Sequence, residues 1–120
     1  MAKALMFNVT GDKEKKLRFL LMQYGITAVE GGAGDCSRPL CEILGRPGGH
    51  SVATLDAPFF DEMLVLDGLD PHQFHGLLNG MQTLQAQVAY KAVTTEHNLN
   101  WTPARLCREL AAEHEAMRRK

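Results

Sequence analysis

The side chains most able to do chemistry lie together in the segment KAVTTEHNLNW, residues 91–101. It supplies an amine, an imidazole, an amide and a hydroxyl in Lys91, His97, Asn98 and Thr95. The segment covers the carboxyl end of a predicted strand, and ligands of open α/β sheets bind at that edge. Two further polar residues end other predicted strands. The candidate ligand-binding residues are therefore Thr10, Asp67, Lys91, Thr95, His97 and Asn98.

The same segment is also typical of a joint between a strand and a helix. Asn98 and Asn100 can shape turns with their side chains, and Thr102-Pro103 is a good helix start. Trp101 would then pack under the first turns of that helix as a structural residue. This interpretation favours a largely buried Trp101, whose replacement by Ala would cost about 3–5 kcal/mol. It expects only about 1 kcal/mol for Asn98→Ala, the worth of one turn hydrogen bond.

Histidines offer a second kind of chemistry. His72 and His75 are three residues apart on one predicted helix, a spacing that two metal ligands can use. We find no Cys or carboxylate nearby to complete a ligand set, which favours surface histidines. His114 lies at the inner edge of the last predicted helix, where we expect a structural contact with another element. The sequence therefore predicts neither a metal nor another cofactor.

The glycine-rich stretch GGAGDCS, residues 31–37, follows a predicted strand and precedes a predicted helix. Backbone amides in such a place can bind an anion, but Asp35 would repel phosphate and no nucleotide-binding motif is present. Cys36, beside the helix start, is a candidate for a lowered thiol pKa. Cys36, Cys41 and Cys107 are an odd number without a C-x-x-C pair, which favours reduced, mostly buried thiols.

The elements that would position these residues alternate along the chain. Apolar runs predict strands at 4–9, 26–30, 62–69 and 87–95. Helical spacing predicts helices at 13–24 and 37–45, and others beginning near residues 70 and 102. Residues 46–62 read as an ordered loop with a brief extended piece at 51–55. The expected helix caps are Ser37, Asp70 and Thr102, and the expected helix stops are Gly25 and Gly45.

This alternation predicts a single α/β domain over residues 1–120. We expect a four-stranded, mostly parallel sheet in the order 2-1-3-4 with helices on both faces. The alternative is a ferredoxin-like α+β sandwich with antiparallel partners and one open face. The loop 46–62 could reverse the third strand, so the sequence leaves its orientation open. We detect no internal sequence repeat.

Composition narrows the partners. The chain has 120 residues and a net charge of −1, so it has no general basic field to attract nucleic acid or anionic lipid. No run approaches the roughly 18 apolar residues of a membrane span. The N-terminal segment reads as a strand rather than a signal peptide. We therefore expect a cytoplasmic protein whose partner is neither nucleic acid nor membrane.

The stretch KAVTTEHNLNWTPARLCRELAAEHEAM resembles the C-terminal signature of an uncharacterised bacterial family, domain of unknown function 3783. RPLCEILGRPGG and EMLVLDGL resemble upstream segments of that family. The resemblance implies a small stand-alone protein of the bacterial cytoplasm and supplies no activity. The residues that match the signature are Lys91, Ala92, Val93, Thr95, Asn98, Trp101, Leu106, Leu110, Glu113 and His114.

Three functions follow from these observations. The lack of a complete catalytic set favours a non-enzymatic regulatory module that binds a small ligand or a protein. The alternative is a small enzyme that uses Lys91 or His97 as acid or base. A weaker alternative is a metal-binding protein that uses His72 and His75. The setting of Lys91 discriminates, because burial would lower the pKa of its amine and favour chemistry, whereas a solvated amine favours the module.

Overall fold

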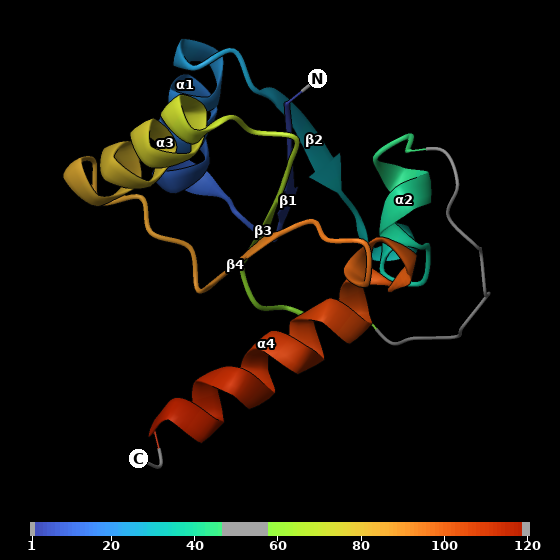
Figure 1. Ribbon diagram of the computed structural model, residues 1–120. Coiled ribbons are helices and arrows are strands. Elements are labelled where there is room, and N and C mark those ends of the chain that lie inside the picture. Colours follow the sequence, from blue (N-terminus) through green and yellow to red (C-terminus); the bar gives the residue numbers. More distant parts are fainter. Residues whose placement is uncertain (1, 47–57, 119–120) are drawn as a thin grey trace.

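The computed structural model describes residues 2–46 and 58–118, which form a four-stranded sheet (Figure 1). Its strands are β1 (Lys3–Phe7), β2 (Thr27–Gly31), β3 (Met63–Asp67) and β4 (Tyr90–Val93). They lie in the predicted order 2-1-3-4. The two outer pairs are parallel, and the central pair of β1 and β3 is antiparallel. The sheet is therefore mixed but mostly parallel.

Helices cover both faces of the sheet, as predicted (Figure 1). The helices are α1 (Gly11–Gln23), α2 (Leu40–Ile43), α3 (Pro71–Thr83) and α4 (Pro103–Arg118), and two 3₁₀ turns are η1 (Ala33–Asp35) and η2 (Asn98–Asn100). Met6 and Leu64 face α1 and α3, whereas Leu5 and Val65 face α2 and the start of α4. Since neither face is open, the fold is not the ferredoxin-like alternative.

The reversed direction of β3 follows from its connection. Parallel neighbours need a helical crossover, which α1 and α3 supply within the two outer pairs. The chain from β2 to β3 instead runs through η1, α2 and the long connection after it. It returns at the end of the sheet where β1 finishes, so Met63 pairs with Phe7 and Asp67 with Lys3. The extended piece predicted at 51–55 lies outside the described residues.

Local capping signals were read correctly at two of the three predicted helix starts. Asp70 accepts a hydrogen bond from the Gln73 amide at 2.7 Å, and the Thr102 hydroxyl accepts one from the Arg105 amide at 3.2 Å. The prediction for Ser37 is wrong, because α2 begins at Leu40 and Pro39 is its N-cap. The Leu40 amide donates to the Trp101 carbonyl at 2.9 Å instead, so a contact distant in sequence satisfies this helix start.

The two halves of the chain repeat one pattern that the sequence did not reveal. β1 and β3 begin at Lys3 and Met63, and α1 and α3 end at Gln23 and Thr83, so both bounds are 60 residues apart. Positive φ angles recur at the same offset, as in Gly25 and Gln85 with φ of 68° and 56°. Over the strands and helices of this offset, Leu17 and Leu77 are identical and the other residues differ, which explains why no repeat was detected.

The paired turn residues lead to a stability prediction. No heavy atom lies within 4 Å of a Cβ built on Gly25, so Gly25→Ala changes only the backbone preference. We expect it to lower the free energy of unfolding by about 1 kcal/mol, because Ala is strained at positive φ. Gln85→Gly should instead raise it by about 0.5 kcal/mol for the same reason. Urea unfolding measures both, and a stable Gly25→Ala protein would contradict the assigned turn.

Candidate functional site

The polar cluster at the carboxyl ends of β3 and β4 is centred on Asp67. Its side chain is almost completely buried at 2% exposure. One carboxylate oxygen accepts hydrogen bonds from Arg46 Nη1 and from the Thr94 hydroxyl, both at 2.7 Å. Arg46 had not been anticipated, since nothing in its sequence surroundings signals this contact. The predicted candidate Asp67 is therefore held between two protein partners.

Thr10 does not join this cluster. Because β1 and β3 are antiparallel, their carboxyl ends lie at opposite ends of the sheet, about 13 Å apart along a strand of this length. Thr10 lies beyond the end of β1, beside a small hollow of about 180 Å³ that Asn8, Glu14 and Glu30 also line. Thr10 and Asp67 were expected at the same edge of the sheet, but they lie at its opposite ends.

Thr95 and Asn98 form a closed turn with each other. The Asn98 side-chain oxygen accepts the Thr95 amide at 2.7 Å, and the Thr95 hydroxyl accepts the Asn98 amide at 3.1 Å. The Asn98 side-chain nitrogen donates to the Val93 carbonyl at 3.0 Å. Asn98 is buried at 7% exposure. The Asn98 side chain therefore connects the end of β4 to η2. Its oxygen and its nitrogen both already make hydrogen bonds within the protein.

Trp101 is less buried at the junction between β4 and α4 than predicted. It packs against the core on the α2 and α4 face, but its side chain is half-buried rather than largely buried. The Arg105 guanidinium lies over the indole ring, 4.3 Å from its centre. The stacked cation occupies one face of the ring, which supports a structural role for Trp101.

The two residues proposed as acid or base are exposed. Lys91 Nζ donates to the Gln87 side chain at 3.2 Å and to the Val88 carbonyl at 3.4 Å. His97 is the N-cap of η2 and makes no side-chain capping hydrogen bond. Lys91 is therefore in the solvated setting that the module hypothesis expects.

The histidines lie against aromatic rings. His72 meets the Tyr24 ring edge-to-face at 5.6 Å, and His114 meets Tyr90 in the same way at 5.0 Å. Within residues 2–46 and 58–118, no group of three or more His, Cys, Asp or Glu side chains could hold a metal ion. The pair His72 and His75 thus gains no third ligand from the described part of the chain.

The glycine-rich loop is filled by its own carboxylate. Asp35 Oδ2 accepts the Gly32 amide at 2.9 Å, and Asp35 Oδ1 accepts Arg38 Nη1 at 2.7 Å. The Gly32 hydrogen bond lowers the pKa of Asp35 despite partial burial, and Arg38 lowers that pKa further. The Cys36 amide donates to the Ala33 carbonyl. The loop is therefore a self-satisfied turn, and the possibility of an anion there is withdrawn.

All three cysteines are buried and unpaired, as expected. Burial raises the pKa of the Cys107 thiol to about 11, and the Asp61 carboxylate contributes in the same direction. Cys107 Sγ lies 3.8 Å from Asp61 Oδ2. A thiol in this state is protonated at neutral pH and is a poor nucleophile.

The raised thiol pKa predicts a loss of stability at alkaline pH. The folded value of about 11 lies above the ordinary 9.0, so the folded state keeps this proton longer than the unfolded chain. The contribution is complete below about pH 9 and is lost as pH rises toward 11. The Cys107→Ala variant should lose less stability than the wild type across this window. Urea unfolding midpoints of the wild type and of Cys107→Ala, measured at several pH values, test this prediction. If both midpoints fell in parallel as the pH rises, the raised pKa of Cys107 would be contradicted.

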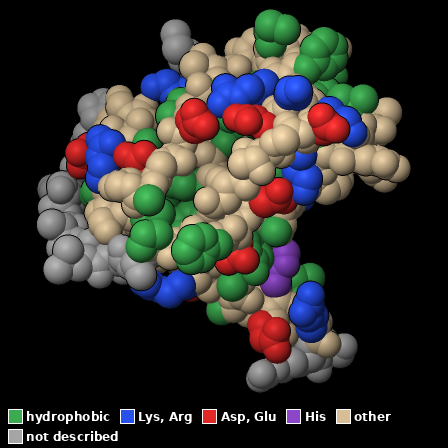
Figure 2. All heavy atoms as spheres, turned by 180° about the vertical axis from the view of Figure 1, so that it is seen from behind, with side chains coloured by type: hydrophobic (Ala, Val, Ile, Leu, Met, Phe, Trp, Pro, Cys, Tyr) green, Lys and Arg blue, Asp and Glu red, His purple; other side chains and the backbone are tan. Residues whose placement is uncertain are grey.

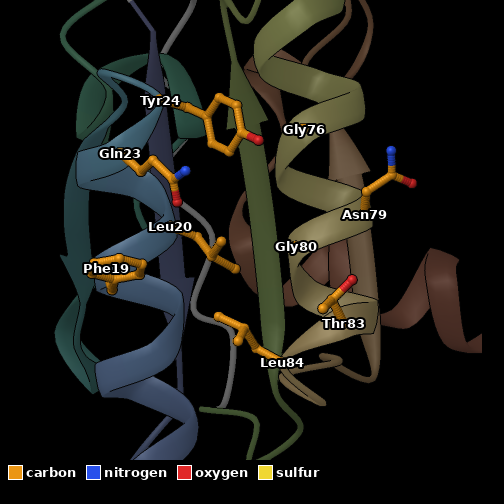
Figure 3. Close-up of a pocket in the computed structure, with 9 residues that line it drawn as sticks. All are labelled: Phe19, Leu20, Gln23, Tyr24, Gly76, Asn79, Gly80, Thr83 and Leu84. Carbon is orange, nitrogen blue, oxygen red and sulfur yellow. The ribbon is translucent and has the colours of Figure 1, made fainter.

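A groove between α1 and α3 was not foreseen. It has a volume of about 350 Å³, and Tyr24 and Leu20 point from α1 toward Gly76 and Gly80 of α3 (Figure 3). A Cβ at Gly80 would lie 2.4 Å from a Leu20 methyl group, so the glycines allow the helices to approach closely. The residues that line the groove are Phe19, Leu20, Gln23, Tyr24, Gly76, Asn79, Gly80, Thr83 and Leu84.

The residues that line this groove are all uncharged, although the N-terminal part of α1 carries several charges. Helix α3, PHQFHGLLNGMQT, contains no Asp, Glu, Lys or Arg, although Asn79 and Gln82 are exposed. On α1, Phe19 and Met22 are 56% and 73% exposed. Figure 2 shows hydrophobic side chains at the top right, over the C-terminal end of α1. The G-x-x-x-G spacing and the uncharged helix were the sequence signals that could have revealed this face.

Comparisons with known proteins add one finding. Residues 62–117 match the model of a family described as Domain of unknown function (DUF3783). The segment RPLCEILGRPGG, which had suggested a longer resemblance, lies outside the matched residues. No curated protein and no solved structure matches the chain. Among the described residues, no helix is long and apolar enough to cross a membrane.

Proposed function

We propose that the protein, whose residues 62–117 match the model of the family described as Domain of unknown function (DUF3783), is a non-enzymatic protein-binding module. Its binding face is the groove between α1 and α3 together with the exposed side chains beside it. We call this surface the α1/α3 face and define it by Phe19, Met22, Asn79 and the two glycines Gly76 and Gly80.

One observation carries the proposal. The α1/α3 face combines a groove between two closely approaching helices with large apolar side chains that are more than half exposed. The cores of protein interfaces are depleted in charge and enriched in aromatic residues and Met. Because the groove is lined by uncharged residues, the partner it fits is a protein that presents an apolar, uncharged side chain.

The predicted polar candidates support a binding module over an enzyme. Asp67 and Asn98 make their hydrogen bonds with the protein itself, and the Lys91 amine is solvated. A general acid or base needs a free, positioned group with a suitable pKa. A small-ligand site at the carboxyl ends of the strands would also have to displace these internal hydrogen bonds.

We place this module in the cytoplasm. All three cysteines are free and buried in the fold. Unpaired thiols fit a reducing compartment, where disulfides are rare. Fractionation of the native host cells, with the protein detected in the soluble fraction, tests the compartment independently of any partner.

A matched pair of variants on one helix tests the α1/α3 face. Asn79 and Gln82 are both exposed on α3, but only Asn79 lines the groove. Asn79→Glu places a charge where the partner's apolar group would sit, and we expect at least tenfold weaker binding, or roughly 1.4 kcal/mol. Gln82→Glu should leave binding unchanged. The readout is the amount of partner that co-purifies with each tagged variant from lysate of the native host.

Thermal melts of both variants show whether a loss of binding is caused by unfolding of the variant. Both substitutions lie on an exposed surface, so their melting temperatures should stay close to that of the wild type. Equal recovery of the partner by both variants would show that binding uses another surface. Absence of any specific partner in the wild-type sample would contradict the module itself.

A further inference from the structure

The two halves of the protein share more than their order of elements. The turn after α1 is closed by the Ile26 amide on the Leu21 carbonyl at 2.8 Å. The turn after α3 is closed in the same way by Ala86 on Met81, also at 2.8 Å. Each half then continues through a strand, a 3₁₀ turn and a helix. The order of elements therefore agrees over the whole β-α-β-3₁₀-α unit, although the 60-residue offset ends after these turns and α4 is longer than α2.

The pairing of β1 with β3 places these units around a two-fold axis. With the 60-residue offset, Lys3 corresponds to Met63 and Phe7 to Asp67. The pair Lys3–Asp67 therefore maps onto the pair Phe7–Met63. Leu5 faces Val65 at the centre of the register and maps onto that same pair. The axis accordingly passes between Leu5 and Val65.

Contacts away from the sheet obey the same symmetry. Leu20 and Gly80 correspond by the offset, and they touch each other where α1 crosses α3. On the opposite face, the Leu40 amide donates to Trp101, and the Ala104 amide donates to Cys36 at 3.3 Å. These two hydrogen bonds run in opposite directions between the two turn-and-helix segments, in which Leu40 corresponds to Ala104 at an offset of 64 and Cys36 to Trp101 at an offset of 65. The halves therefore meet as two copies meet in a symmetric dimer.

The second half needs such a neighbour. All five residues of β3 are buried, although β4 covers only one of its two edges. Without β1, this apolar strand would be an open sheet edge, which natural proteins avoid. The matched family segment, residues 62–117, thus contains a strand whose burial depends on a second unit.

We infer that residues 3–46 are a diverged second copy of the DUF3783 unit, and that the β1–β3 seam is a self-recognition interface between two such units joined in one chain. The inference is independent of the proposed function, although it explains where the groove lies. Four pairs of corresponding residues line that groove on the two-fold axis: Phe19 with Asn79, Leu20 with Gly80, Gln23 with Thr83, and Tyr24 with Leu84.

An exchange of the two residues on the axis tests the symmetry in the full chain. Leu5→Val leaves two Val residues facing each other, and Val65→Leu leaves two Leu residues. Each single variant should lower the folding equilibrium constant roughly fivefold to tenfold. The double variant restores one Leu facing one Val in related surroundings, and we expect it to return within about twofold of the wild type. If the two reductions in the folding equilibrium constant multiplied in the double variant, the proposed symmetry would be overturned.

Native-state hydrogen exchange tests the interface independently of those substitutions. If each unit depends on the other, the most protected amides of β1 and β3 should open together, with the same dependence on denaturant. Protection that persists in β3 after β1 has opened would show that the second unit stands alone. That result would overturn the self-recognition interface.

Discussion

Asn98→Ala should lower the free energy of unfolding by about 2 kcal/mol, because a buried side chain loses its hydrogen bonds to two backbone groups. The amide of Thr95 loses its acceptor, and the carbonyl of Val93 loses its donor. This expectation is larger than the sequence suggested, since the buried Asn98 side chain makes two hydrogen bonds rather than one. Urea unfolding of the variant measures the loss directly.

Neighbouring substitutions separate this effect from a general sensitivity of the joint. Asn98→Asp keeps an acceptor for Thr95 and loses the donor to Val93, so it should lie between Ala and the wild type. His97→Ala should change stability by less than about 0.5 kcal/mol, because His97 is exposed and makes no cap. A stable Asn98→Ala protein would contradict the structural role assigned to Asn98.

Gly80→Ala is the second substitution expected to have a large effect. A methyl group there would lie 2.4 Å from Leu20 Cδ2, so the buried Leu20 side chain, which is 3% exposed, would have to shift. Overpacking should cost about 3 kcal/mol, which outweighs the gain of about 1 kcal/mol from replacing a helical Gly by Ala. We therefore expect a net loss of about 2 kcal/mol in urea unfolding.

Two further variants show whether the clash is the cause. Gly34→Ala has open space around its Cβ and should be nearly neutral. Leu20→Val removes the methyl groups that a side chain at position 80 would meet, so the pair Leu20→Val, Gly80→Ala should recover part of the loss. A Gly80→Ala protein more stable than the wild type would mean that α1 and α3 do not approach as closely as described.

Structural features that depend only on residues adjacent in sequence were predictable. The Asp70 and Thr102 caps each depend on a few adjacent residues, and the strand order followed from the alternation of elements. The direction of β3 was not predictable, because it depends on where a long connection returns the chain. That single unknown also separated Thr10 from Asp67 and so divided the expected site.

The binding face escaped prediction for a different reason. Gly76 and Gly80 read locally as weak points in a helix, and their purpose appears only when Tyr24 and Leu20 lie against them. Arg46 likewise gains its role from Asp67, which is distant in sequence. Contacts of this kind join segments that carry no mutual signal in a single sequence.

Photo-crosslinking at position 19 tests the proposed binding face most directly. A photoreactive phenylalanine analogue replaces Phe19 in one protein and Phe60 in another, since both side chains are exposed, at 56% and 89%. Irradiation in the native host should give a discrete protein adduct from position 19 that Asn79→Glu abolishes, and none from position 60. The absence of an adduct at position 19, or the same adducts from both positions, would contradict a partner bound at the α1/α3 face.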